Sequence, residues 1–345
     1  MPNSFQSIEL LENIHSNNFK ESYWPNTFKK LVNLRLRLGK KIFNILYREK
    51  KKSLLYLSYY YIMSEIIIIY DFSIITSELK KKKIKLYSNS FPRIVNCFYN
   101  KKVPNFPERF FKLNLKKDRL YYLKNILNGS IYGIFQNLLK RKQIYPLRSK
   151  IFRRGCLKNL NVTSVKCSEI DNFIKKKNEI VYYYPIDFWF NTQKRKKNYN
   201  KVFSLDSHTF SEILNLIRKT FNEDNVPLEE NFFKYFKNLL KNLDFFLNEN
   251  YLNLNRKMLP KTFLRLSGKN LWLAILSKAV RDNNGEVLGF NHSNGIVNGI
   301  SEPFLVSELQ ECDKYITNYD ISKTIQDMKK NFKNIHIPDI LINDE

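Results

Sequence analysis

The sequence predicts an α/β protein with a Rossmann-like open parallel sheet and a helical N-terminal region. Strand-like and helix-like segments alternate over residues 260–335, beginning with "KTFLRLSG" and a helical stretch and continuing with "EVLGFNHS". Such alternation indicates βαβ units with parallel strands joined by crossover helices. The 345 residues are 43% hydrophobic and 15% aromatic, which is ample for a packed core. We therefore predict a single large α/β domain over 1–345, with a helical part at about 1–50 and βαβ units at about 260–335.

Two helices are predicted near the N-terminus. "SIELLENIHSNNFKESYW" begins with a serine and has apolar residues at helical spacing. The second helix has Pro25 at a first-turn position, where proline fits the helix geometry. Its apolar residues then follow at steps of three and four: Phe28, Leu31, Leu34 and Leu38.

The next segment, "SLLYLSYYYIMSEIIIIYDFSIIT" at residues 53–76, has almost the length of a membrane span, for which about 20 apolar residues are needed. Glu65 and Asp71 interrupt it, and an acid near the bilayer centre costs about 2.5–3.5 kcal/mol. The run "EIIIIYD" instead predicts a fully buried parallel strand. A buried helix and a transmembrane helix stay open as alternatives. The segment "KKKKIKLY" at 80–87 predicts a charged stretch that leads into a short strand.

The rest of the chain alternates in the same way. We predict a helix over 119–142, a strand from 179 to Pro185, and helices over 208–256. In the βαβ region, "KNLWLAILSKAVRDNNG" predicts a helix that ends with Gly285 near its C′ position. A strand around Tyr315–Thr317 and a further helix follow.

The net charge of +27 would ordinarily suggest nucleic acid or an anionic membrane as partner. However, Lys, Asn, Ile, Phe and Tyr are inflated together, as coding bias in an AT-rich genome produces. We therefore rank coding bias first, an anionic membrane surface second and nucleic acid last. The four cysteines lack metal-site spacing, and the first residues lack the basic and apolar regions of a signal peptide. A cytoplasmic protein with reduced thiols is expected.

The candidate site is the stretch "EVLGFNHSNGIVNG" at 286–299, which contains three of the nine glycines. It places His292 just after a predicted strand, and in open parallel sheets ligands bind at the carboxyl ends of strands. A neutral imidazole can act as a base near pH 7. The alternative is a pair of simple turns with His292 bonded to backbone. In "SGKN" at 267–270, Lys269 lies at a strand-to-helix turn that could hold an anion, although neither P-loop nor GxGxxG spacing is present.

Two segments resemble a known family. "LENIHSNNFKESYWPNTFKKLVNLRLR" at 11–37 and "GKNLWLAILSKAVRDNNGEVLGFNHSNGIVNG" at 268–299, followed by "ECDKYITN", are similar to bacterial transferases of surface-polysaccharide gene clusters. Together they cover about a fifth of the chain. The family is thought to be glycosyltransferase-like, with two Rossmann-type domains that face each other across a cleft, the GT-B arrangement. The chain would then correspond to the N-terminal half, with the second GT-B domain absent, as in a truncated or split enzyme.

The resemblance carries over to individual residues. His15, Tyr23 and Trp24 match its early segment, and Asp313 matches the start of a later strand. In the glycine-rich loop His292 and Gly295 match, whereas Asn291 replaces a glutamine, and Ser293 and Asn294 replace glycines. With the turn at Lys269 added, the candidates are His292 and His15 for catalysis, and Asn291, Ser293, Asn294, Gly295, Trp24 and Lys269 for substrate binding. Glu302 is a weaker carboxylate candidate.

The resemblance implies transfer of a sugar from a nucleotide-sugar donor to a cell-surface glycan, without a cofactor or an obligatory metal. Expected partners are the nucleotide sugar, a glycan acceptor and a separate second Rossmann domain, with peripheral contact to an anionic inner membrane as a further option. Two other classes stay open, a basic nucleic-acid-binding protein and a non-catalytic assembly partner.

Overall fold

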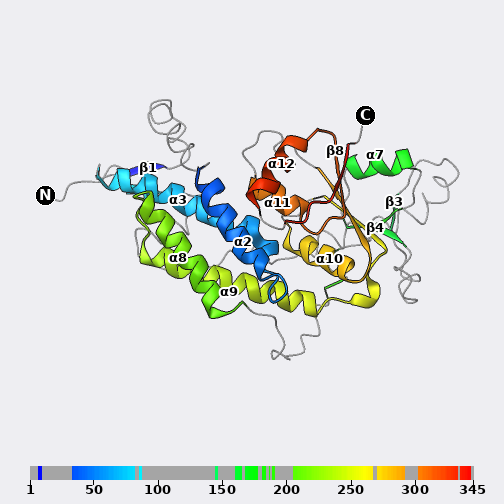
Figure 1. Cartoon of the computed structure of the whole chain (residues 1–345), viewed down its shortest axis with the longest axis horizontal. Helices are drawn as coiled ribbons and strands as arrows, with labels where there is room; N and C mark the ends of the chain where they lie inside the picture. The colour runs from blue at the N-terminus through cyan, green and yellow to red at the C-terminus, as the bar shows by residue number, and fades with distance from the viewer. Residues whose placement is uncertain are drawn as a thin grey trace. The chain divides into compact units, whose positions relative to one another are not determined.

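The computed structural model describes residues 7–9, 33–81, 85–87, 144–146, 160–164, 168–177, 181–183, 186, 189–190, 205–266, 270–291, 302–332 and 335–342 (Figure 1). The chain divides into two compact units. The first comprises Met1–Glu108 and Ser204–Phe245, and we call it the helical unit. The second comprises Arg109–Phe203 and Phe246–Glu345, and we call it the sheet unit.

The described part of the helical unit consists mainly of helices. These are η1 (Arg35–Gly39), α2 (Lys40–Arg48), η2 (Leu55–Ser58), α3 (Tyr59–Lys81), α8 (Ser207–Glu223) and α9 (Glu230–Leu252). The end of α9, from residue 246 on, belongs to the sheet unit. A short parallel pair joins β1 (Ser7–Glu9) to β2 (Lys85–Tyr87). The strand predicted after the lysine run is confirmed by β2. The helix predicted to start at Ser7 is wrong over residues 7–9, and its remainder lies outside the described residues.

Helix α3 corrects the prediction of a strand at "EIIIIYD". The run lies inside a helix of 23 residues. The side chains of Ile62, Ile66, Ile69 and Phe72 are buried. Apolar residues occupy nearly every position here, so periodicity cannot distinguish a buried strand from a buried helix, and length should have decided for the helix. Within the described residues, no helix combines the length and the apolar character needed to cross a membrane.

Two buried acidic side chains of the helical unit, Glu65 and Asp244, are hydrogen-bonded. Glu65 of α3 is 2% exposed and accepts a hydrogen bond from Tyr235 Oη of α9 at 2.6 Å. Asp244 of α9 accepts from Ser53 Oγ and, at 3.1 Å, from the backbone N–H of Leu205. Burying an ionised carboxylate is costly unless hydrogen bonds compensate. These bonds explain how acids are accommodated in apolar helices, and they link segments that are distant in the sequence.

We expect Tyr235→Phe to lower the free energy of unfolding by about 1–3 kcal/mol, because the buried Glu65 side chain would lose its hydrogen bond from Tyr235. Urea unfolding followed by circular dichroism measures the change. Tyr315→Phe is the matched control, since Tyr315 is also buried but its Oη makes no hydrogen bond to the described residues. The control variant should be as stable as the parent or more stable. Equal losses in the two variants would contradict the assignment.

The sheet unit contains the predicted open parallel sheet. Its strands lie in the order β3-β5-β4-β6-β7-β8-β9, and each neighbouring pair is parallel. The strands are β3 (Ile144–Pro146), β4 (Asn161–Thr163), β5 (Val181–Tyr183), β6 (Thr262–Arg265), β7 (Glu286–Phe290), β8 (Lys314–Thr317) and β9 (Asp339–Ile342). The helices are α7 (Ser168–Lys177), α10 (Leu271–Asp282), α11 (Glu302–Leu309) and α12 (Ser322–Asn331), with the short η7 (Arg256–Met258). The α/β fold class and the βαβ units are thus confirmed.

Helices cover both faces of the sheet. On one face, Leu264, Leu288 and Ile316 pack with Ile170 and Ile174 of α7. On the other face, α10 contacts β6 and β7 (Figure 1). Because both faces are covered, the central strands β6 and β7 are buried almost without alternation, as is usual for parallel sheets.

The end of α10 differs by one residue from the prediction. The left-handed conformation is taken by Asn284, with φ of 60°, and Gly285 follows it. The N–H of Gly285 then donates to Val280 O at 2.9 Å, as in a Schellman motif. Gly285 is needed for close packing, because a Cβ atom there would lie 2.6 Å from Val280 Cγ1 and 2.9 Å from Pro260 O.

Candidate functional site

The strand order creates a topological switch point between β4 and β6. The chain passes from β4 to β5 on one side of β4, and β6 then pairs on the other side of β4. Connections therefore leave these two strands in opposite directions, and ligands of open α/β sheets bind in the crevice at such points, beyond the carboxyl ends of the strands. This edge of the sheet, which we call the carboxyl edge, is the candidate site.

Ser164 follows β4 directly at the switch point. Register pairs Thr163 with Leu264, so Ser164 is level with Arg265, the last residue of β6. The Oγ atom of Ser164 is buried and makes no hydrogen bond within the described residues. A buried hydroxyl without a partner is uncommon in folded proteins and is often completed by water or a ligand. Ser164 is therefore a ligand-contact candidate that the sequence did not reveal.

Asn291 leaves β7 at the same edge and is anchored to β8. Its backbone N–H donates to Ile316 O at 2.9 Å, and its Nδ2 lies 3.4 Å from Thr317 Oγ1. The Thr317 hydroxyl also accepts from the N–H of Tyr319 at 3.1 Å and donates to Tyr319 O at 3.2 Å. Because Asn291 is only 8% exposed, its amide acts mainly as an anchor for the chain that follows.

The start of α10 is capped from within the protein. Asn270 Oδ1 accepts from the backbone N–H groups of Trp272 at 3.0 Å and Leu273 at 3.4 Å. These are amides that an anion at a helix N-terminus would otherwise use. The anion-binding hypothesis for "SGKN" is therefore weakened at the helix itself, while Lys269 lies outside the described residues.

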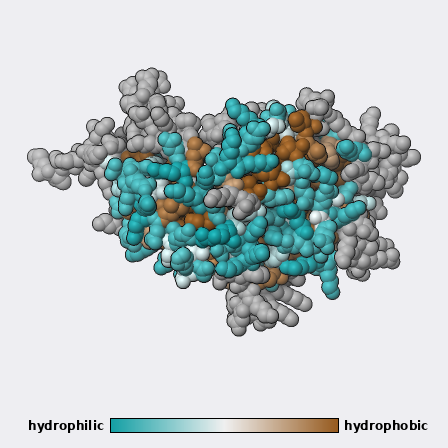
Figure 2. All heavy atoms as spheres, in the orientation of Figure 1, coloured by the Kyte–Doolittle hydropathy of each residue, from teal (hydrophilic) through white to brown (hydrophobic). Residues whose placement is uncertain are grey.

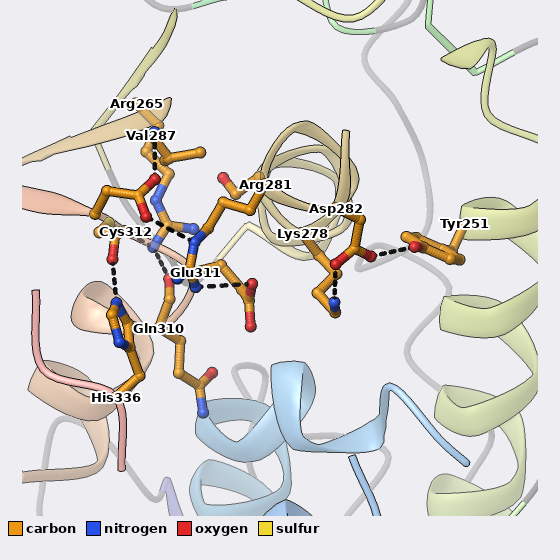
Figure 3. A network of polar contacts seen from close by, with 12 residues as sticks. Tyr251, Arg265, Lys278, Arg281, Asp282, Val287, Gln310, Glu311, Cys312 and His336 are labelled. Carbon is orange, nitrogen blue, oxygen red and sulfur yellow. Dashed lines mark hydrogen bonds and ion pairs between the residues drawn. The ribbon is translucent and has the colours of Figure 1, made fainter. Parts of the chain in front are cut away.

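Arg265 is completely buried beside the switch point (Figure 3). Its Nη2 donates to Glu308 O at 2.9 Å, to Gln310 O and, at 3.1 Å, to Cys312 Sγ. Helix α11 has no basic residue in its last turn, so Arg265 supplies the positive charge and the donors that favour a helix C-terminus. Burial raises the pKa of the Cys312 thiol, which stays protonated at neutral pH.

Gly289 leaves room for the neighbouring side chains of Cys312 and Tyr315. Gly289 pairs with Arg265 on β6 and with Tyr315 on β8. A Cβ atom at Gly289 would lie 2.6 Å from Cys312 Sγ and 2.9 Å from Tyr315 Cδ2. One glycine of the glycine-rich stretch thus serves close packing inside the sheet unit.

Asp313, expected from the resemblance, lies at the opposite, amino edge of the sheet. Its Oδ1 accepts from Arg281 Nε at 2.9 Å and its Oδ2 from the backbone N–H of Val287 at 2.8 Å. Arg281 Nη1 lies 3.3 Å from Glu311 Oε2. These contacts join α10 to the starts of β7 and β8, so the role that the structure gives Asp313 is to hold these elements together.

Of the predicted site residues, the structure describes Asn291, which it brings to Thr317, and the weaker candidate Glu302, at which helix α11 begins. The other candidates lie outside the described residues: His292, His15, Ser293, Asn294, Gly295, Trp24 and Lys269. Sequence reasoning missed Ser164, Thr317 and Arg265. A charged residue inside the apolar strand "TFLRL" was the available signal for Arg265. Among the described residues, no group of three or more His, Cys, Asp or Glu side chains could hold a metal ion.

Comparison with known proteins adds no relative to this picture. No family model matches the sequence, and searches of curated proteins and of solved structures find no significant match. The class that the described residues define is accordingly that of the fold, an α/β protein with a Rossmann-like parallel sheet. The resemblance to polysaccharide transferases stays a prediction.

Proposed function

We propose that this chain is a glycosyltransferase-type enzyme that binds a nucleotide sugar at the carboxyl edge of its parallel sheet. The observation that carries the proposal is the strand order, because the switch point between β4 and β6 is the place where such sheets bind their ligands. Nucleotides are frequent ligands of this crevice. The sugar-transfer chemistry itself rests on the resemblance of residues 11–37 and 268–299.

The supporting residues have distinct roles. Ser164 offers a hydroxyl next to the switch point, and its Oγ has no competing hydrogen bond within the described residues. Asn291 and Thr317 fix the point at which the chain leaves β7, and His292 follows at once. A candidate residue that directly follows an anchored strand end suits a catalytic role better than one in the middle of a long loop, because rigid elements position side chains more precisely.

In the reaction, an acceptor hydroxyl oxygen attacks the anomeric carbon of the donor sugar. The new glycosidic C–O bond forms while the bond between that carbon and the phosphate oxygen breaks, and the nucleoside diphosphate leaves with the electron pair. The acceptor proton passes to a base, for which His292 is the first candidate and His15 the second. Lys269 is the candidate positive group that would stabilise the charge on the leaving phosphate.

Binding is tested first. Isothermal titration with UDP, GDP, ADP and CDP should identify one nucleotide that binds, and Ser164→Ala should weaken its binding because a ligand hydrogen bond is lost. Ser211→Ala is the matched control, since its exposed hydroxyl bonds to Ser207 O on α8. If none of the nucleotides binds, or if both variants bind equally well, the carboxyl edge is not the nucleotide site.

Catalysis is tested by His292→Ala. We expect nucleoside diphosphate release from the nucleotide sugar that binds, in the presence of acceptor glycan, to fall by at least about a hundredfold at an unchanged melting temperature. His208→Ala, at an exposed position in the first turn of α8, should leave the rate unchanged. Full activity of the His292 variant would remove it from catalysis, and the same experiment on His15 would then decide between the two histidines.

A further inference from the structure

One side of helix α9 is basic and exposed. Its other side is buried and apolar, with Phe232, Tyr235, Phe236, Leu239, Leu240, Leu243 and Leu247. The exposed side presents Lys234, Lys237 and Lys241, and Phe245 follows one turn later with 44% of its surface exposed. The steps of three, four and four residues place these four side chains in one line along the helix. We call this line the α9 stripe.

Acidic side chains do not neutralise the α9 stripe. None of its lysines forms an ion pair with the residues that the structure describes. Glu230 at the helix start is 3.3 Å from Arg218, and Asp244 turns inward to Ser53. Asn238 and Asn242 are the exposed residues between the lysines. The stripe therefore carries three positive charges at neutral pH.

The hydrogen bond between Ser53 and Asp244 joins the turn before Ser53 to helix α9. Lys50 and Lys51 lie in the exposed turn just before Ser53. Hydrophilic side chains dominate the described surface in the view of Figure 2, and apolar side chains show between them. An exposed phenylalanine in line with lysines adds a short apolar element to this basic region.

We propose that the α9 stripe binds the anionic surface of a lipid bilayer. Lysine side chains can reach phosphate headgroups while their apolar stems lie along the boundary, and an aromatic side chain inserts at headgroup level. A helix that lies parallel to the surface presents all four side chains at once, over about 16 Å at 1.5 Å per residue. Lysines act as point charges, whereas nucleic-acid recognition favours the planar fork of arginine.

Vesicle co-sedimentation of the full chain tests the proposal. Vesicles of phosphatidylcholine with phosphatidylglycerol should bind the protein, and vesicles of phosphatidylcholine alone should not. The triple variant Lys234→Glu, Lys237→Glu, Lys241→Glu should bind anionic vesicles at least about tenfold more weakly, because each lysine near an anionic surface contributes substantially. Phe245→Ser should weaken binding even in high salt, where charge attraction is screened.

A second triple variant has the same change in net charge. It carries Lys323→Glu, Lys329→Glu and Lys330→Glu, all on the exposed side of α12. This control should bind anionic vesicles within about twofold of the parent if the α9 stripe acts as a local site. Circular dichroism must show that both variants are folded.

Three outcomes would overturn the proposal. One is that the parent does not bind anionic vesicles, and another is that the two triple variants lose equal affinity, which would make net charge the cause. The third is that the α9 variant keeps its vesicle binding but loses binding to a single-stranded oligonucleotide, which would make the stripe a nucleic-acid surface. The nucleotide and transfer assays are independent of all three outcomes.

Discussion

Replacing Arg265 with alanine is expected to lower the free energy of unfolding of the sheet unit by about 3–5 kcal/mol, because buried carbonyls would lose their donor and a large buried side chain would leave a cavity. Arg265 is fully buried, and its guanidinium satisfies the carbonyls of Glu308 and Gln310 at the end of α11. Alanine would leave these carbonyls without their donor and open a cavity beside Gly289. Chemical denaturation followed by tryptophan fluorescence measures the loss, since Trp189 and Trp272 both lie in this unit.

Two comparisons sharpen this prediction. Arg218→Ala is the matched control, because Arg218 is exposed and its ion pair with Glu230 lies at the surface, where such pairs contribute at most about 1 kcal/mol. Gly289→Ala should destabilise by about 1–3 kcal/mol through overpacking against Cys312. If Arg265→Ala unfolds at the same denaturant concentration as Arg218→Ala, Arg265 does not hold α11.

Replacing Asp71 with asparagine is expected to stabilise the helical unit at pH 7 by an amount on the order of 2–3 kcal/mol. Burial in α3 raises the pKa of Asp71 from 3.8 to about 6, and its Oδ1 makes no hydrogen bond to the described residues. The folded state thus favours the neutral carboxyl. Between pH 4 and 6 the folded protein binds more protons than the unfolded chain, so stability from this group falls as the pH rises through that window.

Asparagine cannot ionise and should remove this slope, which thermal unfolding at a series of pH values would show. Asp206 is the control, because its pKa is shifted in the opposite direction. Asp206 caps α8 by accepting a hydrogen bond from the N–H of Thr209 at 2.7 Å, and this bond lowers its pKa. Its contribution is present above pH 4 and is lost as the pH falls, so Asp206→Asn should not gain stability at pH 7. An Asp71→Asn variant with an unchanged pH profile would show that folding does not raise the pKa of Asp71.

Prediction from sequence succeeded best where local signals agreed. The strand–helix–strand segment from Thr262 to Phe290 was identified because short strand-like segments flank a helix-like one, and "DNNG" ends the helix. Prediction failed in α3, where an almost uniformly apolar run lacks the periodicity that separates a helix from a strand. It also failed to single out Arg265, because a charged residue in a strand does not show which carbonyls it will reach.

The candidate site was predicted in part. The emphasis on the carboxyl ends of strands agrees with the position of Asn291, whereas Ser164 and Thr317 were not foreseen. Neither residue stands in a motif. Each becomes a candidate through its neighbours on other strands, and those neighbours depend on the order of strands in the sheet.

The sequence alone thus determined the α/β class and the βαβ units of the C-terminal part, since hydrophobic periodicity, caps and turn residues act over a few positions along the chain. The tertiary structure decided that β6 pairs with β4, that the switch point lies between them, that α3 is a helix, and that Arg265 caps α11. These features come from contacts between residues far apart in the sequence, and such contacts are set by packing and burial, which no local pattern records.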